Sequence, residues 1–237
     1  MELKLETICA LATGSGIGAI AVVRISGPNS RRILSKCFSK DLSKAETHTI
    51  HFGTISSNDG AQIDEVLVSY FEHGRSFTGE ESIEVSCHGS PYVQQQILAV
   101  LQHCGCRMAE PGEFTKRAFI NGKLDLSQAE AVADLIAAQS KKAHRIALSQ
   151  LKGNLSSDLK VLRESLIAFA SLIELELDFS EEDVEFADRT QLKELVAKVL
   201  TTVEQLSASF ALGNALKNGV PVAIVGAPNT GKSTLLN

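Results

Sequence analysis

Apolar residues in the first half of the chain run in short stretches with the length and alternation typical of β-strands. Four stretches have this pattern, at 18–27, 49–56, 63–71 and 81–89. Asp59-Gly60, between the second and the third, is a hairpin turn signal. Residues 31–38 and 92–105 instead have helical spacing, and Gly105 is expected to end the second helix. The pattern predicts an α+β domain.

After Gly122 the apolar period changes to the value near 3.6 that is typical of helices. It predicts three long helices, at 127–153, at about 155–179 and at about 191–212. Ser127 and Glu130 are three residues apart at the start of the first helix, as in a capping box. Since these helices are apolar over much of their circumference, we expect an all-α bundle.

The last apolar stretch, "PVAIVG", predicts a strand that leads directly into a glycine-rich loop. We therefore expect three parts. They are an α+β domain at 1–121, a helical domain at 122–215, and the first strand and loop of an α/β domain at 216–237.

The composition indicates a folded protein, because 44% of the 237 residues are hydrophobic. A formal net charge of −5 argues against a protein whose whole surface follows a phosphate backbone. The first residues lack the features of a secretory signal, and no stretch reaches the roughly 18 apolar residues of a membrane span. We expect a cytoplasmic protein that does not associate with membranes.

Five cysteines at irregular spacing, positions 9, 37, 87, 104 and 106, predict reduced thiols rather than disulfides.

The sequence offers two weak candidates for metal sites. Cys87-His88 and the segment 103–106 lack the paired spacing of zinc ligands, so buried cysteines are favoured. Eight carboxylates between 174 and 188 lack EF-hand spacing, so an acidic helix start capped by Ser180 is favoured over a cation site.

The closing loop contains the clearest chemical motif. Gly226, Gly231, Lys232 and Ser233 satisfy G-x-x-x-x-G-K-[ST] directly after a predicted strand. In this motif the backbone N–H groups surround phosphates, the lysine reaches the β and γ phosphates, and the serine hydroxyl binds Mg2+. The loop sequence "GAPNTGKSTLLN" is similar to that of translation-associated GTPases, which favours GTP over ATP.

Several segments together resemble one family, the bacterial and organellar tRNA-modification GTPases called MnmE or TrmE. The segments are "TICALATGSGIGAIAVVRISGP", "FTGEESIEVSCHGSP" and "RMAEPGEFTKRAFINGKLDLSQAEAVADLI". The resemblance implies an amino-terminal folate-binding domain, followed by a helical domain into whose sequence the GTPase domain is inserted.

Three residues match positions that bind folate in this family: Arg24, Glu84 and Lys123. The resemblance implies that they bind 5-formyltetrahydrofolate or a related tetrahydrofolate. A carboxylate suits the amide and amino groups of a pterin edge, and basic groups suit the anionic glutamate tail. From the residues alone, a cross-strand ion pair of Arg24 with Glu84 and a helix-capping role for Lys123 are the alternatives.

The resemblance also implies the residues that bind nucleotide and ions. The GTP-binding residues would be Asn229, Thr230, Gly231, Lys232, Ser233 and Thr234. Ser233 would bind Mg2+, and Asn229 would bind the K+ that promotes GTP hydrolysis. No residue of this chain is singled out as catalytic.

For the whole protein, the resemblance implies a GTP- and folate-dependent reaction on tRNA. A carboxymethylaminomethyl or aminomethyl group would be added at C5 of the wobble uridine, jointly with the flavoprotein MnmG in a heterotetramer. The amino-terminal domain would pair with a second copy in a homodimer. Two other classes remain open: a folate-dependent one-carbon transferase, and a non-catalytic dimerisation and docking module.

The chain departs from the family pattern at two positions and in its extent. The usual arginine of the first glycine-rich segment is Ile17, and the second glycine of H-G-G is Ser90. Only 19 residues remain from Gly219, whereas a domain needs roughly 100 for a core of its own. We therefore expect this chain by itself to bind GTP poorly and not to hydrolyse it, the tail to be frayed, and the helices to expose apolar surface.

Overall fold

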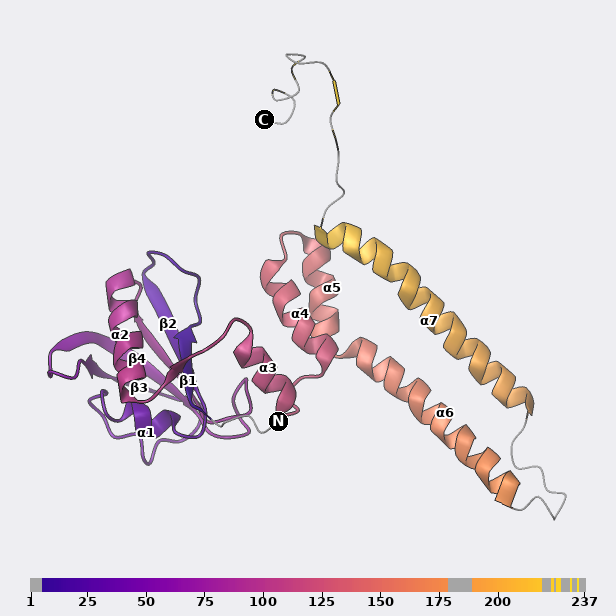
Figure 1. The fold of residues 1–237 in the computed structure, drawn as a ribbon, viewed down its shortest axis with the longest axis horizontal. Coiled ribbons are helices and arrows are strands. Elements are labelled where there is room, and N and C mark those ends of the chain that lie inside the picture. Colours follow the sequence, from indigo (N-terminus) through magenta and orange to yellow (C-terminus); the bar gives the residue numbers. More distant parts are fainter. Residues whose placement is uncertain are drawn as a thin grey trace. The chain divides into compact units, whose positions relative to one another are not determined.

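The computed structural model describes residues 6–178 and 189–218, together with residues 223, 225, 226, 231 and 234. Internal contacts divide the chain into two compact units, Met1–Ala129 and Glu130–Asn237. The elements follow the predicted order, α+β and then helical (Figure 1). The predicted domain limits after residues 121 and 215 stay predictions, and most of the third predicted part lies outside the described residues.

Six strands of the first unit form one mixed sheet. They are β1 (Ile8–Leu11), β2 (Ile20–Ser26), β3 (Thr49–Ser56), β4 (Gln62–Phe71), β5 (Ser82–His88) and β6 (Arg107–Met108). The order across the sheet is β3-β4-β5-β2-β1-β6, and the neighbours are antiparallel except β1 and β6. The four predicted strands and the turn at Gly60, with φ +85°, are confirmed. β1 and β6 are too short for alternation to predict them.

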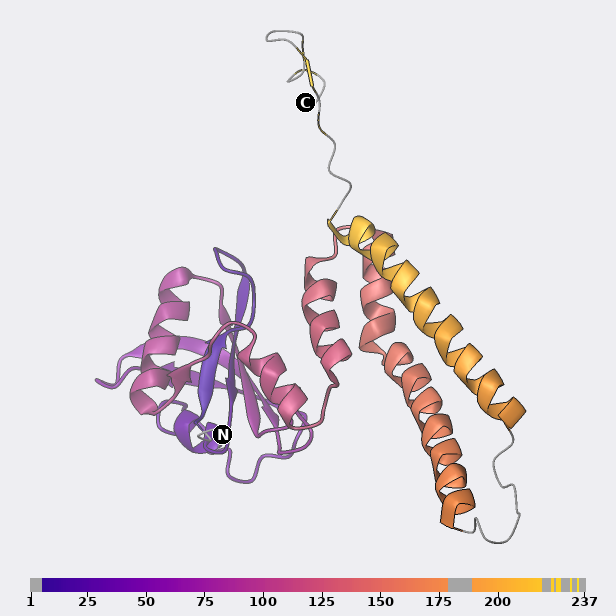
Figure 2. The same cartoon turned by 45° about the vertical axis from the view of Figure 1, so that its right-hand side comes forward.

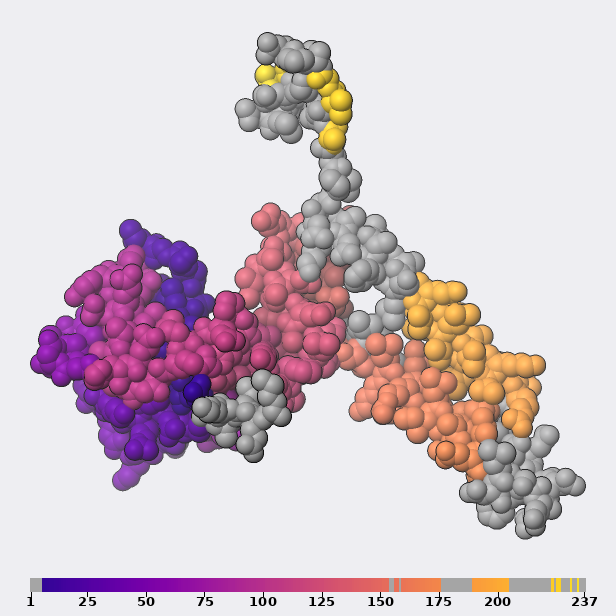
Figure 3. Space-filling view, in the orientation of Figure 1, coloured from indigo at the N-terminus to yellow at the C-terminus, as the bar shows by residue number. Residues whose placement is uncertain are grey.

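Two helices cover one face of this sheet. α2 (Pro91–Cys104) packs against β1, β2, β4 and β5, and α1 (Ser30–Leu34) packs against α2 and β5. The strand residues that face these helices are fully buried, including Val23, Val68 and Val85. In the space-filling view the side chains of this unit form one continuous body (Figure 3). The hydrophobic core of the first unit therefore lies between the sheet and these two helices.

Of the two helices in this layer, α2 ends as the pattern predicts and α1 does not. α2 ends at Gly105 as predicted, because Gly105 adopts the left-handed φ of +119°. The prediction of helix over 31–38 is wrong at its end, since α1 stops at Leu34. The chain then turns so that Phe38 forms an isolated bridge with Ile55 of β3. Tertiary pairing therefore overrides helical spacing here.

The opposite face of the sheet is only partly covered. One row of directly opposed residues crosses five strands, and its members are Ile50, Ser69, Glu84, Arg24 and Ala10. Helix α3 (Glu113–Ile120) lies on this side, so α2 and α3 are on opposite sides of the sheet (Figure 2). We call this face, with its row through Arg24 and Glu84, the open face.

The described residues after α3 form the helices α4 (Leu126–Ala137), α5 (Lys141–Leu151), α6 (Asn154–Asp178) and α7 (Arg189–Asn218). α6 and α7 lie side by side, and α5 contacts both (Figures 1 and 2). The two later predicted helices are confirmed as α6 and α7. Among the described residues, no helix is long and apolar enough to cross a membrane.

The prediction of one helix over 127–153 is wrong, because the structure breaks it into α4 and α5. Ser140 adopts an extended backbone, and its hydroxyl accepts a hydrogen bond from Ala143 N at 3.1 Å. A serine that caps a new helix in this way cannot also continue the preceding one.

The predicted capping box at Ser127 and Glu130 is also wrong. Asp125 Oδ1 accepts from Gln128 N at 2.8 Å, and Gln128 Oε1 accepts from Asp125 N at 2.9 Å. This reciprocal pair is a capping box that begins two residues earlier. In a capping box, aspartate can take the place of serine and glutamine can take the place of glutamate. The sequence therefore offers two overlapping boxes.

Candidate functional site

Arg24 and Glu84 lie directly opposite each other on β2 and β5. Arg24 Nε donates to Glu84 Oε1 at 2.9 Å, and Nη2 lies 2.8 Å from the same oxygen in an ion pair. The two side chains are 25% and 30% exposed, so the pair faces solvent on the open face. The structure therefore contains the cross-strand ion pair that the residues alone suggested. Within the described part of the chain, Glu84 Oε2 and Arg24 Nη1 have no hydrogen-bond partner.

Two aromatic rings that the sequence analysis did not single out flank the Arg24 guanidinium. Arg24 Cζ is 5.3 Å from the ring centroid of Phe77, between β4 and β5, and 5.5 Å from that of Phe114 in α3. Rings at this distance attract the cation and restrict its orientation. Phe77 is 39% exposed although its side chain is large and apolar. The sequence did offer one signal for Phe77. It stands directly before Thr78-Gly79, in a chain in which aromatic residues are rare, at 5%.

Lys123 lies on the turn that ends α3. Its backbone N donates to Ala118 O at 2.8 Å, as in a Schellman motif, so the predicted capping role belongs to its main chain. Its Nζ instead donates to the carbonyl oxygen of Gly74 at 3.0 Å. Lys123 and Arg24 therefore contact the same β4–β5 loop, at Gly74 and at Phe77. The described contacts do not join Lys123 directly to Arg24 or Glu84.

The β4–β5 loop is held in place by a buried ion pair. Arg117 of α3, whose side chain is 6% exposed, donates to both carboxylate oxygens of Glu80 at 3.1 and 3.0 Å. Glu80 also accepts from Ser26 Oγ at 2.7 Å. These bonds connect the loop to α3 and to β2, and so fix the loop that carries Phe77.

A second carboxylate anchors the start of α3. Glu113 accepts hydrogen bonds from Arg107 and Arg117, each at 3.0 Å, and from the backbone N of Glu110 at 2.8 Å. Burial alone raises the pKa of Glu113, but these hydrogen bonds outweigh burial and lower it to about 2. Glu113 is therefore charged at neutral pH and keeps α3 against the first unit's sheet.

The two departures from the family pattern lie close together. Ile17 is 90% exposed, and Ser90 precedes α2 without a side-chain cap bond. Between them, Gly18 N donates to Gly89 O at 3.1 Å. A Cβ at Gly89 would lie 2.2 Å from Gly18 O, so this approach requires glycine at position 89. Neither departure contacts the Arg24–Glu84 pair in the described contacts.

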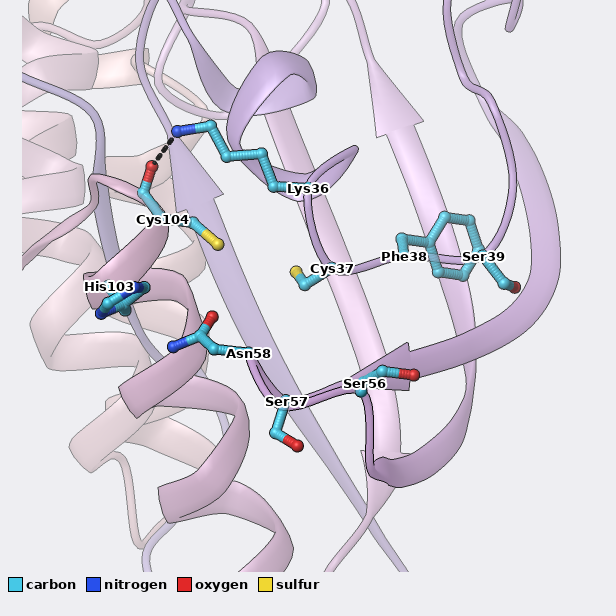
Figure 4. A pocket seen from close by; sticks show the side chains of 10 residues that line it. Lys36, Cys37, Phe38, Ser39, Ser56, Ser57, Asn58, His103 and Cys104 are labelled. Atoms are coloured by element: carbon cyan, nitrogen blue, oxygen red, sulfur yellow. Dashed lines mark hydrogen bonds between the residues drawn. The ribbon is translucent and has the colours of Figure 1, made fainter.

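Two cavities lie away from these residues. The larger, about 650 Å³, lies between the segment after α1, the β3–β4 turn and the end of α2 (Figure 4). A smaller one of about 290 Å³ lies beside Thr7, Asn29 and Arg107. Neither is lined by Arg24 or Glu84 or by Lys123. A ligand held by those three would therefore lie on the open face.

The five cysteines are free in this structure and all are buried, which confirms the prediction of buried cysteines. Burial raises the pKa of Cys87 to about 11 and that of Cys37 to about 12. Within the described ranges, no group of three or more His, Cys, Asp or Glu side chains could hold a metal ion. The acidic segment with Ser180 lies largely outside those ranges.

The predicted nucleotide-binding residues lie mostly outside the described part of the chain. This applies to Asn229, Thr230, Lys232 and Ser233. Gly231 has the positive φ of +79°, and Thr234 N donates to Gly231 O at 3.1 Å. The structure therefore gives no geometry for a bound nucleotide or for the predicted Mg2+ and K+ ligands.

Two family models match this chain. Residues 7–123 match "GTP-binding protein TrmE N-terminus", and residues 126–221 match "MnmE helical domain". Together the two matches include nearly all of the described residues.

Curated proteins called tRNA modification GTPase MnmE are similar over almost the whole chain. The protein of Flavobacterium johnsoniae is 59% identical over 236 residues, and that of Christiangramia forsetii is 57% identical over 236. The protein of Flavobacterium psychrophilum is 58% identical over 237 residues. The matches include 98% of this chain but 50–51% of the relatives, so the chain spans about half their length.

Proposed function

The chain belongs to the MnmE family of tRNA modification GTPases, also called TrmE, and on this basis we propose that it binds a tetrahydrofolate and forms a homodimer. The observation that carries the proposal is the Arg24–Glu84 pair on the open face, with Phe77 and Phe114 beside it. Each part of this arrangement suits one part of a folate molecule.

A pterin ring presents an amino group, a ring N–H and a carbonyl oxygen along one edge. Glu84 has a free acceptor oxygen, Oε2, beside the oxygen that it shares with Arg24. Arg24 Nη1 is a free donor on the same guanidinium among the described contacts. A carboxylate paired with the amino and N–H groups, and a guanidinium donating to the carbonyl, would form charge-assisted hydrogen bonds with this edge. The donors and acceptors that the pair leaves free therefore suit a pterin edge.

The remaining parts of the ligand also have candidate partners. Phe77 offers an exposed ring face for stacking, since it is 39% exposed beside Arg24. Lys123 has an ammonium group with one described partner, the Gly74 carbonyl, and further N–H donors for an anionic tail. Both side chains belong to the β4–β5 loop or contact it, so one ligand could reach both.

The open face also offers a surface for a second copy of the chain. Ile50, Phe52 and Leu67 are 66%, 54% and 46% exposed on β3 and β4, and Phe52 lies directly opposite Leu67. They occupy the same face as Arg24 and Glu84. Contiguous exposed apolar groups of this kind are typical of interaction sites. A copy bound here would shield both the apolar residues and a bound ligand from water.

For the whole protein we propose a GTP-dependent role in tRNA modification. GTP with Mg2+ would bind at Lys232 and Ser233, and K+ would bind at Asn229. Together with MnmG, the protein would add an aminomethyl-type group at C5 of the wobble uridine. The observation in support is the P-loop motif at the end of a chain that spans half the length of its GTPase relatives.

Calorimetric titration of 5-formyltetrahydrofolate into this chain tests the folate proposal. We expect binding by the unaltered chain and a loss of at least tenfold in affinity for Arg24→Ala and Glu84→Gln, since each removes a charged hydrogen bond. Arg31→Ala is the matched control, because Arg31 pairs with Glu81 at 3.1 Å and lies over the Tyr70 ring at 4.8 Å, outside the site. Equal losses in all three variants would contradict the assignment.

Light scattering after size exclusion tests the dimer separately. We expect a dimer for the unaltered chain and a monomer for Phe52→Asp, because the new charge would be buried in the interface. Tyr92→Asp is the control, since Tyr92 is 69% exposed on α2, on the other side of the sheet. A monomeric unaltered chain would rule out this part of the proposal.

The nucleotide part is tested on a longer version that carries the second half found in the relatives. We expect that version to hydrolyse GTP, with K+ dependence lost in Asn229→Ala and hydrolysis abolished in Lys232→Ala. No affinity of the longer version for guanine nucleotides in the presence of Mg2+ would contradict the GTPase assignment.

A further inference from the structure

Two buried thiols face each other at the larger cavity. Cys37 follows α1 and Cys104 is the last residue of α2, and they are 8% and 7% exposed. Both line the cavity of about 650 Å³, and their Sγ atoms point toward one another (Figure 4). Cys37 Sγ donates to the Leu34 carbonyl at 3.4 Å, and the nearby Cys104 thiol contributes to raising the pKa of Cys37. Each is free, so the pair is in its reduced form.

The rim of this cavity is polar and lacks carboxylates. Its ten lining residues include Lys36, His103 and Asn58 and no Asp or Glu. Lys36 Nζ donates to the Cys104 carbonyl at 2.7 Å, which places its ammonium beside that residue. Asp59 lies in the adjoining turn, but its carboxylate accepts from Ser57 Oγ and Ala61 N. The rim therefore suits small anionic molecules more than cationic ones.

We propose that Cys37 and Cys104 form a reversible modification site, at which a small anionic disulfide of the glutathione type converts the two thiols to a disulfide. The Cys104 thiolate, its proton released to water, attacks one sulfur of the reagent and displaces one thiolate. Cys37 then loses its proton to water and attacks the mixed disulfide at Cys104, which releases the second thiolate. The two cysteine sulfurs are oxidised, and the two reagent sulfurs are reduced to thiols.

The order of the two steps follows from the surroundings of each thiol. Burial, together with the neighbouring Cys104 thiol, raises the pKa of Cys37 to about 12. Cys37 is therefore protonated at neutral pH and is the poorer first nucleophile. It serves better as the second one, where it needs only to reach the adjacent mixed disulfide.

The cavity distinguishes this pair from the other thiols. Cys9 and Cys106 also interact with each other, but Cys9 is 0% exposed and lines neither cavity. Cys87 lies at neither cavity. A dissolved reagent can reach both members only at the Cys37–Cys104 pair among these cysteines.

The site is independent of the proposed folate site. Cys37 and Cys104 belong to the core between the sheet and its helices, whereas Arg24 and Glu84 lie on the open face. The disulfide would join residues 67 positions apart and so restrict the unfolded chain, which raises the melting temperature. We expect a rise of at least about 5 °C, with unchanged affinity for 5-formyltetrahydrofolate.

The test is incubation of the folded chain with oxidised glutathione, followed by alkylation and peptide mass mapping. We expect a Cys37–Cys104 peptide and three alkylated cysteines out of the five in the chain, with full reversal by dithiothreitol. Cys37→Ser is expected to stop at the mixed disulfide on Cys104. Cys87→Ser is the matched control and is expected to form the same disulfide as the unaltered chain.

Three outcomes would overturn the proposal. One is a Cys9–Cys106 peptide in place of the Cys37–Cys104 peptide. Another is five unmodified thiols in the folded chain under conditions that oxidise the denatured chain. The third is a melting temperature that falls on oxidation. The mapping of the unaltered chain decides between these results even if Cys37→Ser does not fold.

Discussion

Gly79 occupies a position in the β4–β5 loop that other residues would fill poorly. Its φ is +77°, and a Cβ there would lie 3.0 Å from Lys123 Cγ and 3.1 Å from Asn121 Cβ. The positive φ and the close approach of the α3 turn both favour glycine. Glycine at position 79 is therefore a packing requirement of the Thr78-Gly79-Glu80 motif. It adds to the ion pair that Glu80 of the same motif forms with Arg117.

Gly79→Ala is expected to destabilise the first unit by about 2 kcal/mol, because it combines left-handed strain with a contact that is too close. Gly60→Ala is the matched control, since Gly60 has φ +85° but nothing within 4 Å of a Cβ. The control is expected to lose about 1 kcal/mol from strain alone. Urea unfolding measures both values, and equal losses would show that the contact with the α3 turn is unimportant.

Glu113 is expected to make the first unit sensitive to acid. Its pKa falls from an ordinary value of 4.5 to about 2 in the folded protein. A depressed folded-state pKa gives stability that is present above pH 4.5 and is lost as the pH falls toward 2. The loss is on the order of 3 kcal/mol.

Urea unfolding at several pH values between 7 and 2 measures this loss. Glu113→Gln is expected to lower stability at pH 7, because Arg107 and Arg117 lose a charged partner, and to flatten the dependence below pH 4.5. Glu46→Gln is the control, since Glu46 is exposed and makes no ion pair in the described contacts. An unchanged pH dependence in Glu113→Gln would contradict the assignment.

At the scale of an element, α4 illustrates how the first turn of a helix is chosen. The sequence contains two overlapping boxes, Asp125 with Gln128 and Ser127 with Glu130. The structure uses the first box, with both reciprocal hydrogen bonds formed. The helix therefore begins at Leu126.

Asp125→Ala is expected to weaken the first turn of α4 by about 1 kcal/mol, because it removes the acceptor for Gln128 N. Ser127→Ala is the matched control and is expected to change stability by no more than a few tenths of a kcal/mol. Amide hydrogen exchange in the first turn of α4 measures both. Faster exchange in Ser127→Ala than in Asp125→Ala would mean that the second box forms in solution.

At the scale of the whole molecule, the two units differ in how much they bury. The core of the first unit contains more than twenty buried apolar residues between the sheet and its helices. In the described part of the chain after residue 129, the buried side chains are Ala131, Ala147, Leu162 and Phe169. Large apolar side chains such as Leu200 and Val161 are more than half exposed there. Hydrophobic stabilisation is therefore concentrated in the first unit.

We expect the chain to unfold in urea in two transitions, the helical unit first. Both tyrosines, Tyr70 and Tyr92, lie in the first unit, and the chain has no tryptophan, so near-ultraviolet dichroism at the tyrosine band reports that unit. Far-ultraviolet dichroism also follows the long helices and should change at lower urea. Tyr92→Phe leaves buried Tyr70 as the sole tyrosine reporter. Coincident transitions would show that the units unfold as one.

The sequence alone determined the main strands, the later helices and the order of the α+β and helical parts. Residues 49–56 and 63–71 alternate regularly, and Asp59-Gly60 between them specifies a turn, so local rules suffice. The family resemblance, which both family models confirm, came from motifs such as "FTGEES" that are visible without any structure. Arg24 and Glu84 were named for the same reason.

The tertiary structure alone decided which residues meet. Register across the sheet pairs Arg24 with Glu84, and packing brings Phe77 and Phe114, 37 positions apart, to the same guanidinium. It also ended α1 early, broke the first long helix at Ser140, and brought Cys37 to Cys104. These outcomes depend on contacts between residues far apart in the chain, and periodicity within a short window carries no information about them.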